Sequence, residues 1–176
     1  IEIRTAVLTP NHPDLATSNY DLASLLQAQA KYAEAETLFR KAVEMRRASL
    51  GESHKDYATA VDNLAGVIRR LGRLDEAETL HRNALGLRRE FLGEDHLDTA
   101  ASLNNLGALL RDRGRYHEAA ELLEQASAIK QELGSENLRV TLHELGLTYQ
   151  RLNRLDEAER LHLGAMMISN DPSGTR

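Results

Sequence analysis

The sequence predicts an all-α protein built from stacked pairs of antiparallel helices, and three observations support this fold class. First, the sequence repeats itself, because a shift of 42 residues places His12 on His54 and His54 on His96. A period of this length is typical of repeat architectures. Second, apolar residues recur at helical spacing within each copy. Third, no proline interrupts the chain between Pro13 and Pro172, so continuous helices are allowed there.

Each copy contains two amphipathic helices. In the third copy, Leu103, Leu106 and Leu110 supply the apolar face of the first helix, and Ala119 and Leu122 supply that of the second. The same spacing predicts helices at residues 14–29, 32–50, 56–71, 74–92, 97–113, 116–133, 138–152 and 155–169. Connections of a few residues make neighbouring helices antiparallel. Because one hairpin cannot bury its apolar stripe alone, the pairs are expected to stack on one continuous core.

Turn residues mark both kinds of connection. Within a pair, the break falls at a residue suited to a left-handed helix cap: Ala30, Gly72, Gly114 or Asn153. Between pairs, Gly51 and Gly93 are expected to end a helix, and Ser53 or Asp95 to cap the next one. The fourth copy follows at a spacing of 39. The three missing residues predict a tighter turn around Gly134, with no loss of a helix.

The repeats divide the chain without a linker. Residues 1–11 read as the end of a preceding truncated repeat, because a shift of 42 places Leu8 on Leu50. The chain is therefore expected to be a fragment of a longer protein. Four repeats follow, and a polar tail ends the chain. The repeats span residues 12–53, 54–95, 96–136 and 137–169, and the tail spans residues 170–176.

Small residues mark the expected close contacts between helices. They are Ala23, Ala65, Gly107 and Gly146 in the first helices, and Ala35, Ala77, Ala119 and Ala158 in the second helices. A large side chain at one of these positions is expected to cost about 1–3 kcal/mol through overpacking.

Composition excludes several classes of function. The net charge of −5 argues against general nucleic-acid binding, which favours a basic surface. No apolar run approaches the roughly 20 residues that cross a bilayer, so no membrane partner is expected. The chain has no cysteine, which excludes disulfides and cysteine-based zinc sites. With no signal-peptide pattern at its start, the chain is expected to be cytoplasmic.

No enzyme chemistry is predicted. The histidines at 12, 54 and 96 come from three different repeats, so they cannot converge on one metal ion and are expected to serve in turns or caps. His81 and His162 are expected to be partly buried packing residues. The sequence lacks a phosphate-binding loop, a zinc-protease motif and a nucleophile elbow. We therefore expect no catalytic residue, no metal and no cofactor.

The residues of the third copy resemble the tetratricopeptide repeat (TPR). The pattern consists of Leu103, Leu106-Gly107, Leu110, Gly114-Arg115-Tyr116, Glu118-Ala119, Leu122 and Ala126. The period of 42 and the phrase LGEDHLDTAASLNN resemble the long variant found in kinesin light chains, which nephrocystin-3-like and bacterial signalling proteins share. The resemblance implies an alpha-alpha superhelix, a right-handed TPR solenoid of antiparallel helix pairs. It also implies that the first helix of each pair lines a concave groove for an extended peptide or a partner helix.

The residues expected to line this groove lie on the side of the first helices that faces away from the core. They are Tyr20, Asp21, Gln27, Asp62, Asn63, Arg69, Arg70, Asn104, Asn105, Arg111, His143 and Glu144. Asn63 and Asn105 occupy the position of an asparagine that lines the groove in kinesin-light-chain-like arrays. An amide can donate to and accept from a peptide backbone at once. Asp21 and Glu144 occupy this position in the outer copies and interrupt the series.

Two readings remain open for the arginines. Arg69, Arg70 and Arg111 either bind acidic residues of a ligand or are solvated cations that favour the ends of their helices. The carboxylate clamp of chaperone-binding TPR domains is not matched, since its second asparagine is replaced here by Ser24, Gly66, Ala108 or Leu147.

The second helices carry many glutamates, which predict a solvated, salt-bridged convex face together with Arg40, Arg46 and Arg82. The function expected from these features is a protein–protein interaction scaffold whose groove binds an extended peptide or partner segment. The alternative is a structural or regulatory array that packs on a neighbouring domain of its parent protein, or associates end to end through its terminal repeats.

Overall fold

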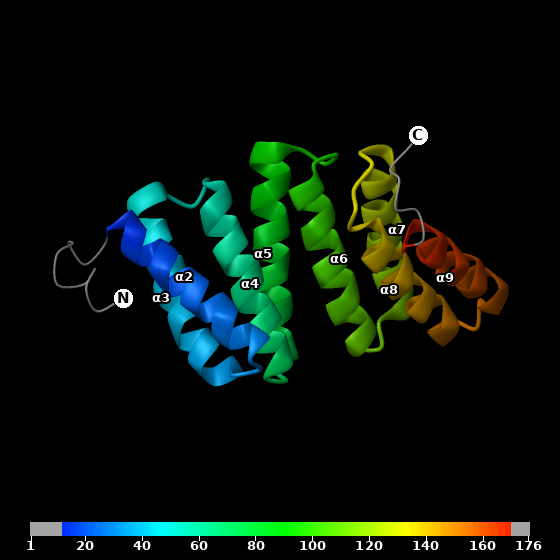
Figure 1. The fold of residues 1–176 in the computed structure, drawn as a ribbon, viewed down its shortest axis with the longest axis horizontal. Coiled ribbons are helices and arrows are strands. Elements are labelled where there is room, and N and C mark those ends of the chain that lie inside the picture. Colours follow the sequence, from blue (N-terminus) through cyan, green and yellow to red (C-terminus); the bar gives the residue numbers. More distant parts are fainter. Residues whose placement is uncertain (1–11, 170–176) are drawn as a thin grey trace. The chain divides into compact units, whose positions relative to one another are not determined.

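The computed structural model describes residues 12–169. The chain divides into two compact units, Ile1–Phe91 and Leu92–Arg176. The expected repeat end at residues 1–11 and the polar tail at residues 170–176 lie outside the described residues. Within residues 12–169 all regular structure is helical, as Figure 1 shows. The predicted all-α fold of helix pairs is confirmed.

Two helix pairs form each unit. The first unit contains α2 (Pro13–Ala28), α3 (Tyr32–Leu50), α4 (Lys55–Arg70) and α5 (Leu74–Leu92), and α3 packs against both α2 and α4. The second unit contains α6 (Leu97–Asp112), α7 (Tyr116–Glu132), α8 (Leu138–Arg151) and α9 (Leu155–Ser169). There α8 packs against α6, α7 and α9. Every helix end lies within one residue of its expected position, because the apolar period and the turn residues agree on each boundary.

The turns within pairs use the left-handed conformation that the sequence predicts. Gly72 and Gly114 have φ angles of 82° and 76°, and Ala30 and Asn153 have φ angles of 58° and 59°. Glycine adopts this conformation without a steric penalty, whereas alanine does not. The first pair therefore carries a strained turn at Ala30.

Histidines, and not the residues before them, cap the first helices of three pairs. The Nδ1 atoms of His12, His54 and His96 each accept a hydrogen bond from a backbone N–H two residues further along the chain. The expected cap role of these histidines is confirmed. The expectation that Ser53 or Asp95 caps the helix is wrong, because the N-cap position falls one residue later.

The connection before the fourth copy is not tighter than the others. Residues 133–137 separate α7 from α8, whereas four residues (51–54 and 93–96) separate the earlier pairs. The missing residues come from the helices instead: α7 has 17 residues where α3 and α5 have 19, and α8 has 14 where α4 and α6 have 16. A turn needs a minimum length to reverse the chain, whereas a helix can lose residues from its ends.

Each unit has its own apolar core. In the first unit, Tyr57, Val61 and Ala84 form a buried cluster. In the second unit, a larger cluster joins three helices: Ala120, Leu123, Leu145, Tyr149 and Ala158. All the small residues that the sequence places at helix contacts are buried. The two glycines among them leave no room for a side chain, since a Cβ atom on Gly107 would lie 2.8 Å from Leu123 Cγ, and one on Gly146 would lie 2.6 Å from His162 Cε1.

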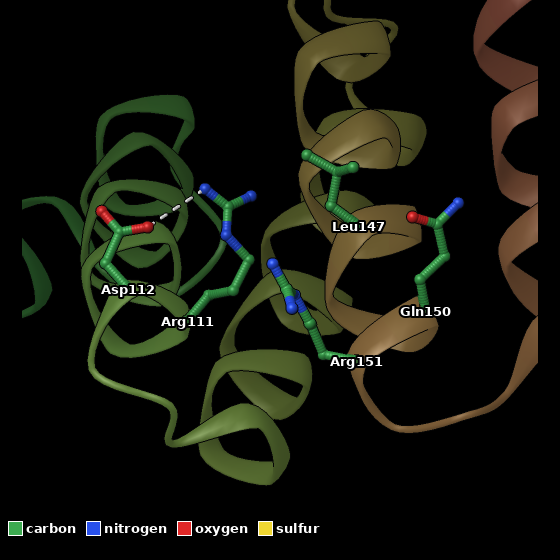
Figure 2. A pocket seen from close by; sticks show the side chains of 5 residues that line it. All are labelled: Arg111, Asp112, Leu147, Gln150 and Arg151. Atoms are coloured by element: carbon green, nitrogen blue, oxygen red, sulfur yellow. Dashed lines mark hydrogen bonds and ion pairs between the residues drawn. The ribbon is translucent and has the colours of Figure 1, made fainter.

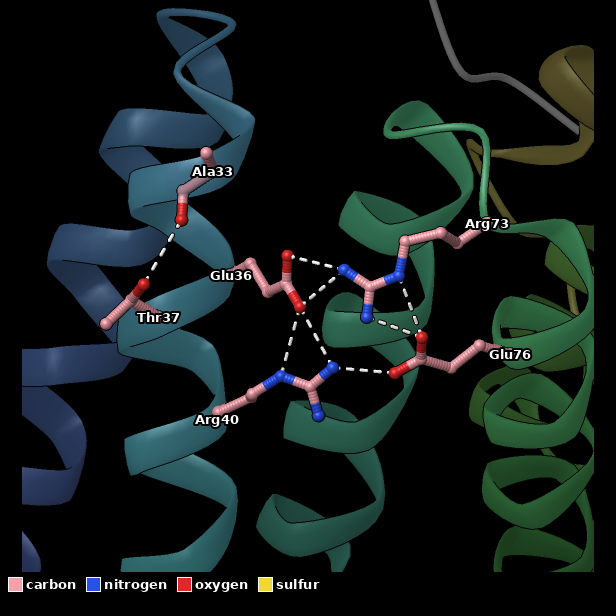
Figure 3. Close-up of polar contacts among 6 residues, drawn as sticks. All are labelled: Ala33, Glu36, Thr37, Arg40, Arg73 and Glu76. Atoms are coloured by element: carbon pink, nitrogen blue, oxygen red, sulfur yellow. Dashed lines mark hydrogen bonds and ion pairs between the residues drawn. The ribbon is translucent and has the colours of Figure 1, made fainter.

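An ionic cluster on the first unit joins α3 to the turn and first residues of α5 (Figure 3). Arg40 contacts Glu36 and Glu76 at 2.9 and 2.6 Å, and Arg73 bonds to the same two glutamates. Hydrogen bonds from Arg40 and then Arg73 hold the pKa of Glu76 below its usual value. The predicted salt-bridged surface is confirmed for these residues. Arg46 is an exception to the prediction because it is buried.

Candidate functional site

The first unit brings together two of the expected groove residues. Asn63 on α4 donates a hydrogen bond from its amide to the hydroxyl of Tyr20 on α2. The Tyr20 ring packs edge-on against Phe39, with ring centroids 5.5 Å apart, and burial raises the pKa of its hydroxyl. Tyr20 and Asn63 therefore link two first helices of neighbouring repeats, and part of the Asn63 amide is already used within the protein.

Asp62 is not open to a ligand. Its side chain is 4% exposed, with one carboxylate oxygen 2.7 Å from His81 Nδ1 and the other accepting a hydrogen bond of 2.9 Å from Arg88. Both partners lie on α5, so the carboxylate ties α4 to the second helix of its own pair. The expectation that Asp62 lines the groove is wrong. Its position turns toward the neighbouring helix, where a buried carboxylate requires a cationic partner. His81, expected to be a partly buried packing residue, is fully buried, and its ring bonds to Asp62.

The other candidates of the first unit remain accessible. Asp21 and Arg70 are exposed, and Gln27 and Arg69 are half-buried. Arg69 and Arg70 occupy the last turn of α4, where a cation interacts favourably with the helix dipole. Their location agrees with both readings of the sequence, as solvated cations or as contacts for an acidic ligand.

In the second unit, an ion pair connects the two first helices. Arg111 on α6 donates to a carboxylate oxygen of Glu144 on α8, and its guanidinium lies 3.3 Å from Asp112. Both members of the Arg111–Glu144 pair are partly exposed. The positive charge of Arg111 is therefore balanced within the protein. An acidic ligand would have to compete with Glu144 and Asp112 for it.

An open cavity of about 500 Å³ lies beside this ion pair, toward the ends of α6 and α8. Arg111 and Asp112 line it from α6, and Leu147, Gln150 and Arg151 line it from α8 (Figure 2). All five side chains are at least partly accessible to solvent. The cavity combines charged and amide groups with one apolar side chain.

A second cavity of about 380 Å³ lies toward the starts of α6 and α8, at the opposite end of these two helices from the first cavity. Asn104 and Asn105 line it from α6, Val140 lines it from α8, and Lys130 lines it from α7. Its remaining lining residues are Leu97, Asp98, Ala101, Ser135 and Asn137. Two expected groove residues, Asn104 and Asn105, therefore share a cavity. We call this cavity the Lys130 pocket.

The last candidate lies on a different side of α8. The His143 ring packs against the His162 ring of α9, with centroids 5.3 Å apart. Both rings line a cavity of about 320 Å³ together with Arg139, Ala165 and Met166. Within residues 12–169 no group of three His, Asp or Glu side chains is arranged to hold a metal ion, and no helix there is long and apolar enough to span a membrane.

Sequence reasoning missed a cation that recurs in the second helices at the repeat period. Arg46 and Arg88 are both buried, at 7% and 5% exposure. Each faces a residue 26 positions earlier on the first helix of its pair. Arg46 lies 4.3 Å from the centroid of the Tyr20 ring, and Arg88 bonds to the Asp62 carboxylate. In both pairs the positive charge meets a ring face or a carboxylate, which stabilises it.

Lys130 occupies the same position in the third pair. It is 5% exposed, and its ammonium donates a 2.7 Å hydrogen bond to Thr141 Oγ1 on α8. The residue 26 positions earlier is Asn104, whose Oδ1 atom is buried and has no hydrogen-bond partner in the described structure. The signal that could have found this site is the series at positions 46, 88 and 130, which is visible once the repeats are superimposed.

The sequence pattern of the tetratricopeptide repeat family matches residues 1–48 and 56–132, and a second pattern with the same description matches residues 138–168. No curated protein sequence matches the chain. Among solved structures, BtubC (BKLC) from P. vanneervenii is 26% identical, with a TM-score of 0.85 over 99% of this chain and 71% of that one. A Podosopora anserina protein with nearly identical TPR-like repeats of the kinesin light chain kind is 27% identical, with a TM-score of 0.76 over 99% of this chain and 84% of that one.

Proposed function

Because this chain belongs to the tetratricopeptide repeat family, with repeats of the kinesin light chain type, we propose that it is a binding scaffold whose α6–α8 face holds an extended segment of a partner protein. One observation carries the proposal. Two open cavities lie along α6 and α8, the first helices of two neighbouring repeats, and the amide side chains of Asn104 and Asn105 line one of them. Such side chains can bond to a peptide backbone without reading its sequence.

The second unit supports this proposal better than the first. In the first unit the matching asparagine, Asn63, already donates to Tyr20, and Asp62 is closed off by His81 and Arg88. In the second unit Asn104 has an unused acceptor.

The test is capture of interacting proteins with the chain, followed by mapping of the bound segment and measurement of its affinity. Replacing Asn104 and Asn105 together by alanine is expected to weaken binding of the mapped peptide by roughly 10-fold or more, since each lost hydrogen bond costs about 0.5–1.5 kcal/mol. Asn83→Ala provides the matched control, because Asn83 is exposed on α5. Equal affinities for the double variant, the control and the parent would exclude binding on this face.

A second candidate function, docking on a neighbouring domain or on a second copy, is favoured by the apolar surface of α9. Leu163, Met166 and Met167 are 53%, 63% and 74% exposed. Single apolar residues on a surface are ordinary, but a group on one helix is typical of an interface. Light scattering at rising concentration tests self-association, and a mass that stays monomeric would exclude it. We also propose a cytoplasmic location, on the sequence grounds given above.

A further inference from the structure

The Lys130 pocket contains a buried cation that has no carboxylate partner. Lys130 is 5% exposed, and within the described structure its hydrogen bond to Thr141 is its only polar side-chain contact. Burial lowers its pKa, as expected for an ammonium group that has lost water and gained no negative charge. A buried charge normally has a counter-ion, because the cost of removing it from water is otherwise not offset.

The comparison with the neighbouring repeat shows what is missing. Arg88, 42 positions before Lys130, reaches the Asp62 carboxylate at 2.9 Å. The residue 42 positions after Asp62 is Asn104, which offers a neutral amide in place of a carboxylate. The protein therefore keeps the cation at this position but not the anion, and it leaves an open cavity of about 380 Å³ beside both residues.

The pocket holds one acidic residue, and it does not balance Lys130. Asp98 lies in the first turn of α6, where its side chain is 48% exposed and 3.9 Å from His96 Nδ1. No ion pair joins Asp98 to Lys130 in the part of the chain that the structure describes. The rest of the lining is apolar or neutral. A ligand carboxylate therefore finds one buried ammonium with hydrogen-bonding capacity to spare, since an ammonium has three donors.

We propose that the Lys130 pocket binds a carboxylate group of the peptide segment, with the Lys130 ammonium as its counter-ion and the side chain of Asn104 lining the pocket beside it. This inference rests on the proposed function of the α6–α8 face. It differs from the carboxylate clamp considered above, because the cation belongs to the second helix of a pair and is buried. The carboxylate comes from an Asp or Glu side chain or from the C-terminus of the segment.

The first experiment asks whether Lys130 lacks a counter-ion. We compare the thermal unfolding of Lys130→Met with that of the matched variant Arg88→Met. Arg88→Met leaves the Asp62 carboxylate without its guanidinium partner and is expected to lower the melting temperature by roughly 10 °C. Lys130→Met removes a buried charge that no carboxylate balances, so it is expected to melt at or above the temperature of the parent. A loss as large as that of Arg88→Met would overturn the proposal.

The second experiment uses a library of short random peptides displayed with free or amidated C-termini. Selection against the parent chain is expected to enrich peptides that carry an acidic residue or need their free C-terminus. Replacing that carboxylate by its amide is expected to weaken binding to the parent by roughly 10- to 100-fold, the range for a charge-assisted hydrogen bond. The same replacement is expected to change binding to Lys130→Met by less than about 3-fold, because a double-mutant cycle isolates the paired interaction.

The outcomes separate this inference from the proposed function. Lys41→Met, which removes an exposed lysine of α3, controls for net charge and is expected to behave as the parent does. Peptides that bind on α6 and α8 with no need for a carboxylate would support the scaffold and overturn the carboxylate site. If no peptide is selected, the proposed function fails, and acetate then serves as the probe. Saturable NMR shifts at Thr141 in the parent that are absent in Lys130→Met would support the site, and identical spectra would overturn it.

Discussion

The contact between Gly107 and Leu123 gives the sharpest prediction about stability. A Cβ atom on Gly107 would lie 2.8 Å from Leu123 Cγ, 3.1 Å from Leu123 Cδ2 and 3.3 Å from the carbonyl oxygen of Ala119. The first distance is too short for two carbon atoms, and Leu123 is fully buried in the core of the second unit, so it has little room to move. Gly107→Ala therefore forces α6 and α7 apart or displaces the Leu123 side chain.

Two terms of opposite sign decide the size of the effect. Overpacking a well-packed core costs about 1–3 kcal/mol, whereas alanine is better than glycine in a helix by about 1 kcal/mol. We expect a net loss of about 1–2 kcal/mol in the free energy of unfolding. Gly86→Ala is the matched control, because Gly86 lies inside α5 and a Cβ atom there has no neighbour within 4 Å. It is expected to gain about 0.5–1 kcal/mol.

Urea unfolding followed by circular dichroism measures both variants, and a double variant identifies the cause. Leu123→Ala alone is expected to cost about 2–5 kcal/mol through the cavity that it leaves. In the Gly107→Ala background that cost should fall by about 1–3 kcal/mol, because the new methyl group fills part of the cavity and the overlap disappears. Additive effects, or a Gly107→Ala variant as stable as Gly86→Ala, would refute the reasoning.

Three further predictions follow from other parts of the structure. Ala30→Gly is expected to raise the free energy of unfolding by about 0.5–1 kcal/mol in urea titrations, because Ala30 has a φ of 58°; a decrease would contradict the strain. Asp62→Ala is expected to lower it by about 3–5 kcal/mol, since Arg88 then stays buried without that carboxylate, and a change below 1 kcal/mol would contradict the buried triad. Burial, and then the hydrogen bond to Glu124, raise the pKa of the Tyr149 hydroxyl to about 12, so its phenolate absorbance should appear near pH 12. Because the pKa of this hydroxyl is higher in the folded than in the unfolded protein, its contribution to stability is fully present below the unfolded pKa near 10. The contribution is lost as pH rises from 10 to 12. The difference spectrum between the parent and Tyr149→Phe measures the folded-state pKa.

The fold could be predicted almost completely from the sequence because it depends on period and spacing. A repeat of 42 residues sets the number of pairs, and the left-handed turn residues, such as Gly72 and Gly114, set where each pair bends. The error in the helix caps lies where two neighbouring residues compete for one role. Ser53 and His54 both precede α4, and the one that caps the helix is decided by where the first helical residue falls.

The candidate site was harder to predict than the fold. The exposure of a side chain on the first helix of a pair depends also on the second helix, and the apolar spacing of the first helix does not describe that neighbour. Helical spacing alone places Asp62 and Asn104 at the same distance from the core. Whether each is covered depends on the side chain 26 positions later, and on how far that side chain reaches. Arg88 reaches Asp62 and closes its position, whereas Lys130 bonds to Thr141 on the next repeat and leaves Asn104 Oδ1 without a partner.

A repeat protein can convert a structural position into a binding position with few changes, and the Arg88 and Lys130 positions show how. In the second pair, cation and carboxylate satisfy each other, so the position contributes to the cohesion of the hairpin and offers nothing to a ligand. In the third pair, the carboxylate becomes an amide at Asn104. The Lys130 ammonium is then left with no carboxylate partner in the described structure, and Asn104 Oδ1 with no hydrogen-bond partner there, beside a cavity. Local rules of folding are broken mainly where function requires it. The departure of one repeat from the pattern of its neighbours is therefore a better guide to the ligand than the features that all the repeats share.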